Sequence, residues 1–263
     1  MTAARRALAH VAARSTGGPV DRALRVTLNF HPERVVAALA DTGAYVSQFV
    51  TGTGNGGLTA FPGGDRRRWE SRMFGGAYDD APAHERPVYG GLNFRRSPYG
   101  ASPRFGSSHL RLNPEVVDRT TFCYPDSSTE PELFGVAHRS RLVEAALADR
   151  RDLLDDYVEA HVHGPVSVGA DVGALVLDPS YRGTPVEEAA RRLPCAVEWH
   201  PGFRLHVDEL RRHPDFRGPR FVALGEEIAV DGWLTPRIIG DRAGRHDPQD
   251  LKKIWHLLAR FGR

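Results

Sequence analysis

The sequence has few cysteines and no long apolar run, and both shortages narrow the class of protein. Its two cysteines, Cys123 and Cys195, are too few and too far apart for a disulfide framework, so we expect reduced thiols. No run of about 20 apolar residues is present, which excludes a transmembrane helix and a membrane partner. The first residues include arginines but lack the apolar core of a signal peptide. We therefore expect a cytoplasmic protein.

Lysine is also scarce, because Lys252 and Lys253 are the only two among 35 basic residues. The other basic residues are arginines, whose planar guanidinium suits phosphate binding, although genomic base composition explains the same abundance. With 33 acidic residues the formal net charge is only +2. This balance argues against a dedicated nucleic-acid-binding protein, while a local basic groove keeps nucleic acid open as a partner.

What is present is the pattern of a folded domain of 263 residues, 41% of them hydrophobic. We predict one α+β domain over residues 25–263, with a mixed or antiparallel β core, flanking helices and a loop-rich middle region over residues 75–131. A helical extension precedes it over residues 1–24. The predicted strands are Arg25–Phe30, Tyr45–Val50, Val88–Phe94, His109–Leu112, Tyr157–Val162, Gly173–Leu177 and Ala196–His200, and the predicted helices are Ala3–Arg14, Glu33–Asp41, Arg66–Phe74, Phe134–Ala148, Pro185–Arg192, Pro219–Val230 and Pro248–Phe261.

Residues 51–57 read Thr-Gly-Thr-Gly-Asn-Gly-Gly, a loop whose backbone can approach a ligand closely. Successive N–H groups in such a loop can hold an anion. The segment lacks the Lys-Ser/Thr pair of a P-loop and the glycine spacing of a dinucleotide fingerprint. A plain glycine turn is the alternative interpretation. The polar candidates in and before this loop are Ser47, Gln48, Thr51, Gly52, Thr53 and Asn55.

The second candidate segment is Tyr157–Pro165. On a strand, Tyr157, Glu159, His161 and His163 share one face because side chains alternate. Three interpretations are open at this point. The face is the solvated side of a half-buried strand, or a site centred on the Glu159 carboxylate, or a metal site with two imidazole ligands.

Four segments together resemble the bacterial domain of unknown function 3626 family: Ser47–Ala60, Phe74–Tyr78, Arg86–Asn93 and Glu159–Pro165. The resemblance covers most of the chain, from about Arg25 onward. It implies no activity, because the family name carries none.

A more distant similarity is to ADP-ribosyltransferases, in the order of a basic residue, a Thr51-Gly-Thr53 segment and a late strand with Glu159. It implies an ADP-ribosyltransferase-like fold and an enzyme that uses NAD to modify a macromolecular or small-molecule acceptor, as a toxin or effector does. Glu159 is then the catalytic carboxylate, and arginines of Arg66–Arg72 are further candidates for the pyrophosphate. The residues implied in NAD binding are Arg25, His31, Ser47, Gln48, Thr51, Gly52, Thr53, Asn55 and His161.

Two rival functions are a metal-dependent hydrolase that uses His161 and His163, and a non-catalytic module in which the glycine loop contacts a partner. For the transferase we expect no bound metal. It also requires that the glycine loop and Glu159 face each other across one cleft.

Overall fold

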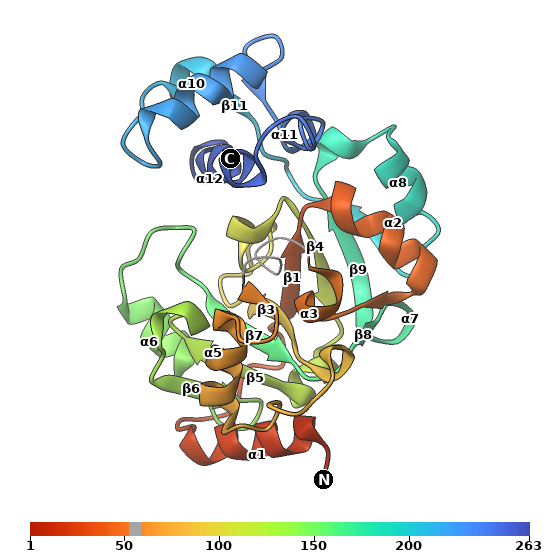
Figure 1. Cartoon of the computed structure of the whole chain (residues 1–263), viewed down its shortest axis with the longest axis vertical. Coiled ribbons are helices and arrows are strands. Elements are labelled where there is room, and N and C mark those ends of the chain that lie inside the picture. The colour runs from red at the N-terminus through yellow and green to blue at the C-terminus, as the bar shows by residue number, and fades with distance from the viewer. Residues whose placement is uncertain (53–58) are drawn as a thin grey trace.

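The computed structural model describes residues 1–52 and 59–263 and contains one α+β domain around an eight-stranded sheet (Figure 1). The strand order is β10-β9-β4-β1-β3-β7-β5-β6. Strands β9 and β10 pair in parallel and the other neighbours are antiparallel, which confirms the predicted mixed sheet. The strands are β1 (Val26–Phe30), β3 (Val88–Leu92), β4 (Ser108–Leu112), β5 (Thr120–Tyr124), β6 (Leu133–Val136), β7 (Val158–Val162), β9 (Val172–Leu177) and β10 (Ala196–Trp199).

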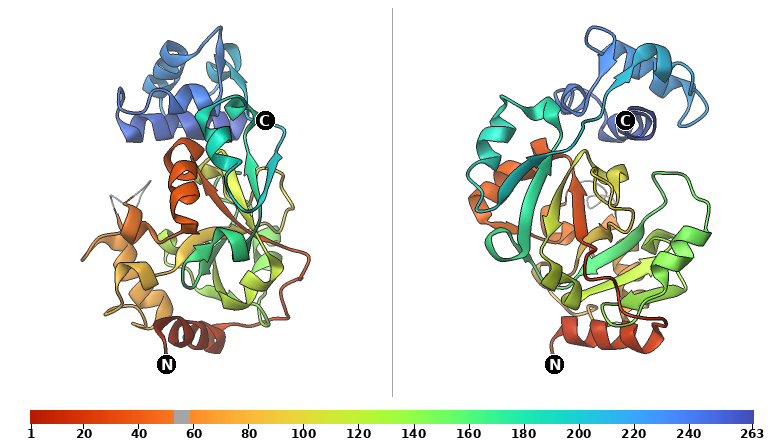
Figure 2. Two further views of the ribbon diagram at one scale, coloured as in Figure 1. Left: turned by 90° about the vertical axis from the view of Figure 1, so that its right-hand side faces the viewer. Right: turned by 180° about the vertical axis from the view of Figure 1, so that it is seen from behind.

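Helices and two short ribbons surround this sheet (Figures 1 and 2). The ribbons pair β2 (Ala44–Tyr45) with β8 (Val166–Ser167), and β11 (Leu205–His206) with β12 (Trp233–Leu234). The helices are α1 (Ala3–Arg14), α2 (Pro32–Thr42), α3 (Gln48–Thr51), α5 (Asp65–Phe74), α6 (Leu142–Ala148), α7 (Val168–Asp171), α8 (Pro185–Ala190), α9 (Val207–Leu210), α10 (Pro219–Ile228), α11 (Pro236–Gly240) and α12 (Pro248–Phe261), with short 3-10 turns η1 (Ala83–Glu85), η2 (Pro103–Phe105), η3 (Pro114–Arg119), η4 (Ser127–Thr129) and η5 (Pro179–Tyr181).

The two faces of the sheet differ in chemistry. One face is apolar and forms the main core with α2 and α8, and it includes Leu28, Leu110, Val158 and Leu175. Each such side chain, when fully buried, contributes about 1.5–3 kcal/mol to folding. The opposite face carries polar side chains that alternate with the core positions. Because paired residues of neighbouring strands share a face, the polar face holds Thr27, Asn29, Tyr89, His109, Thr121, Glu159 and His161.

The sheet is only weakly joined between β1 and β3. The two strands pair at two positions, Val26 with Leu92 and Thr27 with Gly91. Beyond Thr27, β1 stays paired with β4, while β3 stays paired with β7. The sheet therefore consists of two halves that meet at one end of β1. Glycine is required at this junction, because a Cβ on Gly90 would lie 2.5 Å from the Thr27 carbonyl oxygen.

Two further apolar clusters lie at the ends of the molecule. Helices α9 to α12 and the β11–β12 ribbon enclose a core of their own at one end. Trp255 of α12 fastens this C-terminal unit to the sheet region by donating from Nε1 to the Pro103 carbonyl, at 3.0 Å. At the other end, α1 packs on α5 and β6 through a third cluster (Figure 1). Residues 1–24 thus contact the domain closely, and the boundary at residue 24 stays a prediction.

Two predicted elements are wrong. The sequence predicts a strand over Tyr45–Val50, but β2 ends at Tyr45 and the helix α3 follows. Ser47 Oγ accepts a hydrogen bond from the Phe49 N–H, which starts a helix at this point. The predicted helix Phe134–Ala148 is strand β6 followed by α6. Its first part pairs with β5, a strand that the sequence analysis missed inside the loop-rich middle region.

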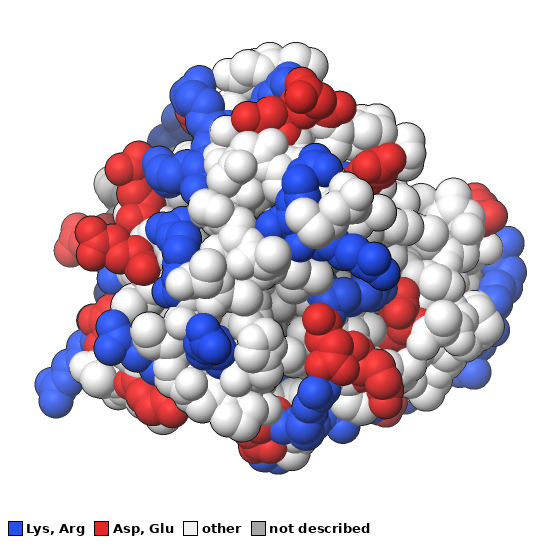
Figure 3. Space-filling model, turned by 90° about the horizontal axis from the view of Figure 1, so that it is seen from below, with Lys and Arg blue, Asp and Glu red and all other residues white. Residues whose placement is uncertain are grey.

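On the face of the molecule shown in Figure 3, basic and acidic side chains are interspersed. This distribution of charge agrees with the nearly equal numbers of basic and acidic residues in the sequence. Among the described residues, no helix combines the length and the apolar character needed to cross a membrane.

Candidate functional site

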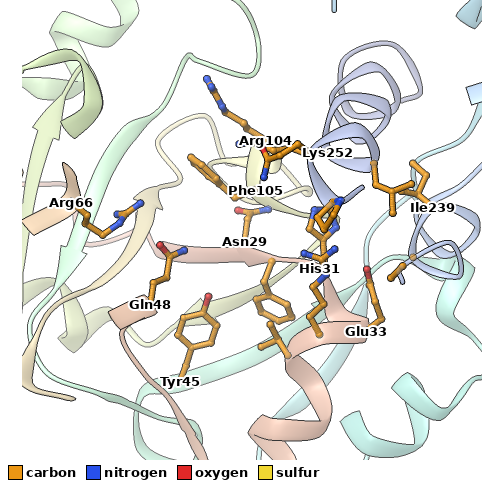
Figure 4. A pocket seen from close by; sticks show the side chains of 18 residues that line it. Asn29, His31, Glu33, Tyr45, Gln48, Arg66, Arg104, Phe105, Ile239 and Lys252 are labelled. Carbon is orange, nitrogen blue, oxygen red and sulfur yellow. The ribbon is translucent and has the colours of Figure 1, made fainter. Parts of the chain in front are cut away.

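A cavity of about 120 Å³ opens at the end of β1, beyond its last residue pair with β3, which is Thr27 with Gly91 (Figure 4). Its floor is formed by Asn29, Phe30 and His31 at the end of β1. Gln48 of α3 and Arg66 of α5 approach from one side, and Lys252 of α12 approaches from the opposite side. The cavity thus lies between the sheet and the C-terminal unit, and chain segments more than 200 residues apart in sequence form its walls.

The amide groups of the cavity play two different roles. Asn29 Nδ2 donates to the Tyr99 carbonyl at 2.8 Å, and Asn29 Oδ1 accepts from the Ser102 N–H at 3.2 Å. Asn29 therefore fixes the loop after β3. Gln48 Oε1 is buried and has no hydrogen-bond partner among the described residues. An acceptor in this condition suits an N–H group of a ligand, since an unpartnered buried acceptor is costly.

The cationic groups of the cavity give it a positive character. The Arg66 side chain lies over the Tyr89 ring at 4.2 Å, and the residue is only 8% exposed. Within the described part of the chain, Arg66 makes no ion pair. Arg104 forms an ion pair with Asp155. Burial and the nearby Arg104 lower the pKa of Lys252 to about 8, as expected where cations crowd together.

Of the two basic residues considered for the first strand, only His31 lines the cavity. Its ring contacts the Trp255 ring edge-on, with centroids 5.3 Å apart. Burial lowers the pKa of His31, so the imidazole is neutral at pH 7. Arg25 lies at the opposite end of β1, where its guanidinium donates to the carbonyls of Arg22 and Leu24 at 2.8 and 2.9 Å.

The predicted loop residues lie in different places. Ser47 is buried and caps α3, as described above, so its hydroxyl serves the fold. Thr51 ends α3 and is exposed, and Gly52 follows it in a left-handed conformation with φ of 60°. Thr53 and Asn55 lie outside the described residues. The prediction that the glycine loop faces Glu159 also concerns residues outside the described ranges.

Glu159 is the second residue of β7, lies on the polar face and is 6% exposed. Its Oε1 accepts from His161 Nε2 at 2.8 Å, from the Ser127 N–H at 3.2 Å and from the Cys123 thiol at 3.9 Å. No hydrogen bond from a described residue reaches Oε2. One carboxylate oxygen is therefore fixed by three donors.

Glu159 does not line the cavity directly, and Tyr89 connects the two places. Tyr89 pairs with His161 across the strands, and its ring contacts the His161 ring edge-on at 5.0 Å. On its other side the Tyr89 ring carries the Arg66 guanidinium, which lines the cavity. Burial and the charges of Glu70 and Glu159 raise the pKa of Tyr89, so its hydroxyl keeps its proton.

The interpretation of this strand face as solvated is wrong, because Tyr157, Glu159, His161 and His163 are all buried. Phe74 of α5 covers the two histidines, with ring centroids 5.3 and 5.4 Å away.

Among the described residues, His163 does not belong to the group that could hold a metal ion. His163 bonds to Tyr78 OH through Nδ1 and to Thr121 Oγ1 through Nε2, so both of its nitrogens are occupied. A different trio could hold a metal: the ligand atoms of Cys123, Glu159 and His161 lie within 4.8 Å of one another. Burial and Glu159 raise the pKa of the Cys123 thiol, which therefore acts as a hydrogen-bond donor here.

The four segments that carry the family resemblance meet at one place. Arg86 donates to the Tyr78 carbonyl at 2.6 Å and lies over the Phe49 ring at 4.6 Å. Tyr78 in turn bonds to His163. A family model described as a protein of unknown function (DUF3626) matches residues 25–152 and 138–261. The chain belongs to the DUF3626 family. No curated protein matches it.

Neither comparison brings up an ADP-ribosyltransferase, so that resemblance stays a prediction for this DUF3626 protein. The sequence analysis missed Arg104 and Lys252 as cavity residues, because only the folded chain brings α12 beside β1. Among the arginines of Arg66–Arg72, only Arg66 lines the cavity. Arg67 donates to the Asp79 carbonyl, and Arg68 and Arg72 pair with Asp65 and Glu130.

Proposed function

We propose that this DUF3626 protein binds NAD in the cavity at the end of β1 and transfers the ADP-ribosyl group to an acceptor. The observation that carries the proposal is the carboxylate of Glu159, which is fixed at Oε1 and receives no hydrogen bond at Oε2 from the described residues. It lies on the same sheet face as Thr27, two strands away through Gly91, and Asn29 of the cavity floor follows Thr27 on that face. Paired strands are about 4.8 Å apart and the rise along a strand is about 3.3 Å per residue, so we expect one extended ligand to reach both places.

The chemistry requires a fixed negative charge. Cleavage of the bond between nicotinamide and ribose leaves positive charge on the ribose ring, as in glycosidic bond cleavage. A carboxylate that is already oriented stabilises this charge without reorganisation. Glu159 Oε2 serves that role, while the three donors at Oε1 hold its position. His161 and Ser127 act as positioning residues.

Recognition of NAD follows from the cavity walls. Arg66 from α5 and Lys252 from α12 bind the pyrophosphate from opposite sides, and guanidinium groups suit phosphate oxygens. Gln48 Oε1 accepts an N–H of the adenine amino group. The cavity of about 120 Å³ is smaller than the 300–1,000 Å³ typical of ligand pockets, so it holds only part of the dinucleotide. The nicotinamide riboside half extends past Tyr89 toward Glu159.

The test is the Glu159→Gln variant, which keeps the shape and removes the charge. We expect release of nicotinamide from NAD to fall by about 100-fold or more, because the electrostatic stabilisation is lost. The melting temperature should change little, and NAD should still raise it. The matched control is Glu132→Gln, an exposed glutamate. Full NAD consumption by the Glu159→Gln variant would overturn the proposal.

A metal-dependent hydrolase is the second candidate, favoured by the trio of Cys123, Glu159 and His161. The three side chains offer thiolate, carboxylate and imidazole, a donor set that suits zinc. Metal analysis of the purified protein separates the candidates. Stoichiometric zinc that is lost in Cys123→Ser, together with activity abolished by a chelator, favours the hydrolase. Chelator-resistant release of nicotinamide favours the transferase.

A further inference from the structure

A continuous series of buried hydrogen bonds leads from Glu159 into the interior of the protein. Glu159 Oε1 bonds to His161 Nε2 at 2.8 Å, and His161 Nδ1 bonds to Thr121 Oγ1 at 3.3 Å. Thr121 Oγ1 bonds to His163 Nε2 at 3.1 Å, and His163 Nδ1 bonds to Tyr78 OH at 2.7 Å. The series thus links β7, β5 and the segment after α5.

The direction of these bonds follows from counting protons. An ionised carboxylate only accepts, so His161 Nε2 donates to Glu159. With the ring proton of His161 on Nε2, Nδ1 accepts the single hydroxyl proton of Thr121. Thr121 Oγ1 therefore accepts from His163 Nε2, and His163 Nδ1 accepts from Tyr78. Each of the four bonds has one donor and one acceptor, with no proton missing or left over.

The surroundings agree with this arrangement. Hydrogen bonds at both nitrogens of His163 hold its ring in one orientation. Burial raises the pKa of Tyr78, so the phenol keeps the proton that it donates. The Tyr78 and His163 rings stack at 5.8 Å with an interplanar angle of 3°. Aromatic packing therefore holds the rings in the orientation that the bonds require.

We propose that Tyr78, His163, Thr121 and His161 form a one-directional positioning relay that fixes Glu159 Oε1 and holds both histidines as neutral Nε2–H tautomers. The predicted effect on catalysis rests on the function proposed above. The predicted tautomers do not depend on that function. Bonds that all point the same way polarise one another and strengthen the last donor, which is the one to Glu159. Tyr78 is fully buried, so the relay ends inside the protein and serves orientation, not proton transfer to solvent.

The tautomers are measured by ¹⁵N NMR of the imidazole rings in the whole protein without NAD. We expect both His161 and His163 as Nε2–H tautomers. In Tyr78→Phe the donor to His163 Nδ1 is lost, so the His163 tautomers should mix and the His161 ¹⁵N shifts should move. Tyr124→Phe is the control, because it removes a hydroxyl bonded to Asp149 outside the relay. An Nδ1–H tautomer at either ring, or unchanged His161 shifts in Tyr78→Phe, would overturn the relay.

The positioning effect is measured through kcat and KM of NAD turnover. His161→Gln keeps an N–H donor for Glu159 and an oxygen acceptor for Thr121, so we expect kcat within about threefold of the wild-type value. His161→Leu loses both, and kcat should fall about 10- to 100-fold with KM nearly unchanged. An unchanged kcat in His161→Leu refutes positioning. If the wild-type protein does not turn over NAD, the proposed function fails, and the NMR result still decides the relay.

Discussion

Lys252, one of two lysines in the chain, is the cavity cation whose charge changes close to neutral pH. Its pKa is about 8, because burial removes water from the ammonium and the neighbouring Arg104, Lys253 and Arg217 repel its charge. Below pH 8 the side chain is positive and attracts an anion. Above pH 8 it becomes neutral, and the attraction is lost.

We therefore expect the affinity for NAD to weaken about 3- to 10-fold between pH 7 and pH 9, measured by calorimetry with the Glu159→Gln protein. Stability should move in the opposite direction. The ordinary pKa of lysine is 10.5, so the unfolded chain binds more protons between about pH 8 and 10.5, and the free energy of unfolding rises with pH in that interval.

Two control variants test whether the pH dependence of NAD affinity arises from Lys252 or from a neighbouring residue. Lys252→Arg keeps its charge at pH 9 and should bind NAD equally at both pH values. Lys253→Arg should keep the pH dependence of the wild-type protein. Equal affinity of the starting protein at pH 7 and pH 9 would contradict the role given to Lys252.

At the scale of single residues, the sequence predicts which side chains of one strand share a face, because side chains alternate along a strand. Glu159 and His161 are placed on one face because they are two residues apart on β7. The same rule does not tell whether that face is buried, since burial depends on Phe74 of α5. The approach of Lys252 to His31 is beyond sequence reasoning, because these residues are brought together only by tertiary packing.

At the scale of elements, one buried ion pair fastens α5 to the start of β3. Arg86 donates to Glu70 at 2.5 Å, and their side chains are 5% and 0% exposed. Burial raises the pKa of Glu70 to about 7, although Arg86 opposes the shift. Because α5 also carries Arg66, the pair indirectly positions one wall of the cavity.

We expect Arg86→Met to lower the free energy of unfolding by about 3–5 kcal/mol, since it leaves the Glu70 carboxylate buried without its partner. Urea denaturation at pH 8, where Glu70 is largely ionised, measures the loss. The double variant Glu70→Gln, Arg86→Met should recover much of it. Arg72→Met, on the same helix but in an exposed pair with Glu130, should cost less than about 1 kcal/mol. Equal losses in Arg86→Met and Arg72→Met would contradict this explanation.

The sequence predicts elements well where the pattern is local. Helix Pro248–Phe261 is found with the predicted bounds, because Asp247 caps it and apolar residues recur along one face. The prediction fails for Phe134–Ala148, because Leu133–Val136 pairs with β5 as an edge strand. Strand pairing across the sheet is a long-range interaction, and local propensity does not contain it.

At the scale of the whole molecule, the cavity is closed by two parts with separate cores. Helix α5, which packs beside the sheet, contributes Arg66, and the C-terminal unit contributes Lys252. Trp255 joins the two parts through its hydrogen bond to Pro103 and its contact with His31. A single α+β domain follows from the pattern of the sequence. The sequence does not predict that the C-terminal helices form one wall of the site, because no local feature of residues 203–263 indicates contact with β1.

A ligand that contacts both walls should restrain the C-terminal unit relative to the sheet. We expect saturating NAD to slow amide hydrogen exchange in α12 and at the end of β1, because opening of the cavity then requires the ligand to dissociate. Helix α1 lies at the far end of the molecule and is the internal control (Figure 1). In Lys252→Gln, NAD should no longer protect the amides of α12 from exchange. It should still protect those at the end of β1 in part. Equal slowing in α1 and α12, or none in α12, would show that the ligand does not bridge the two parts.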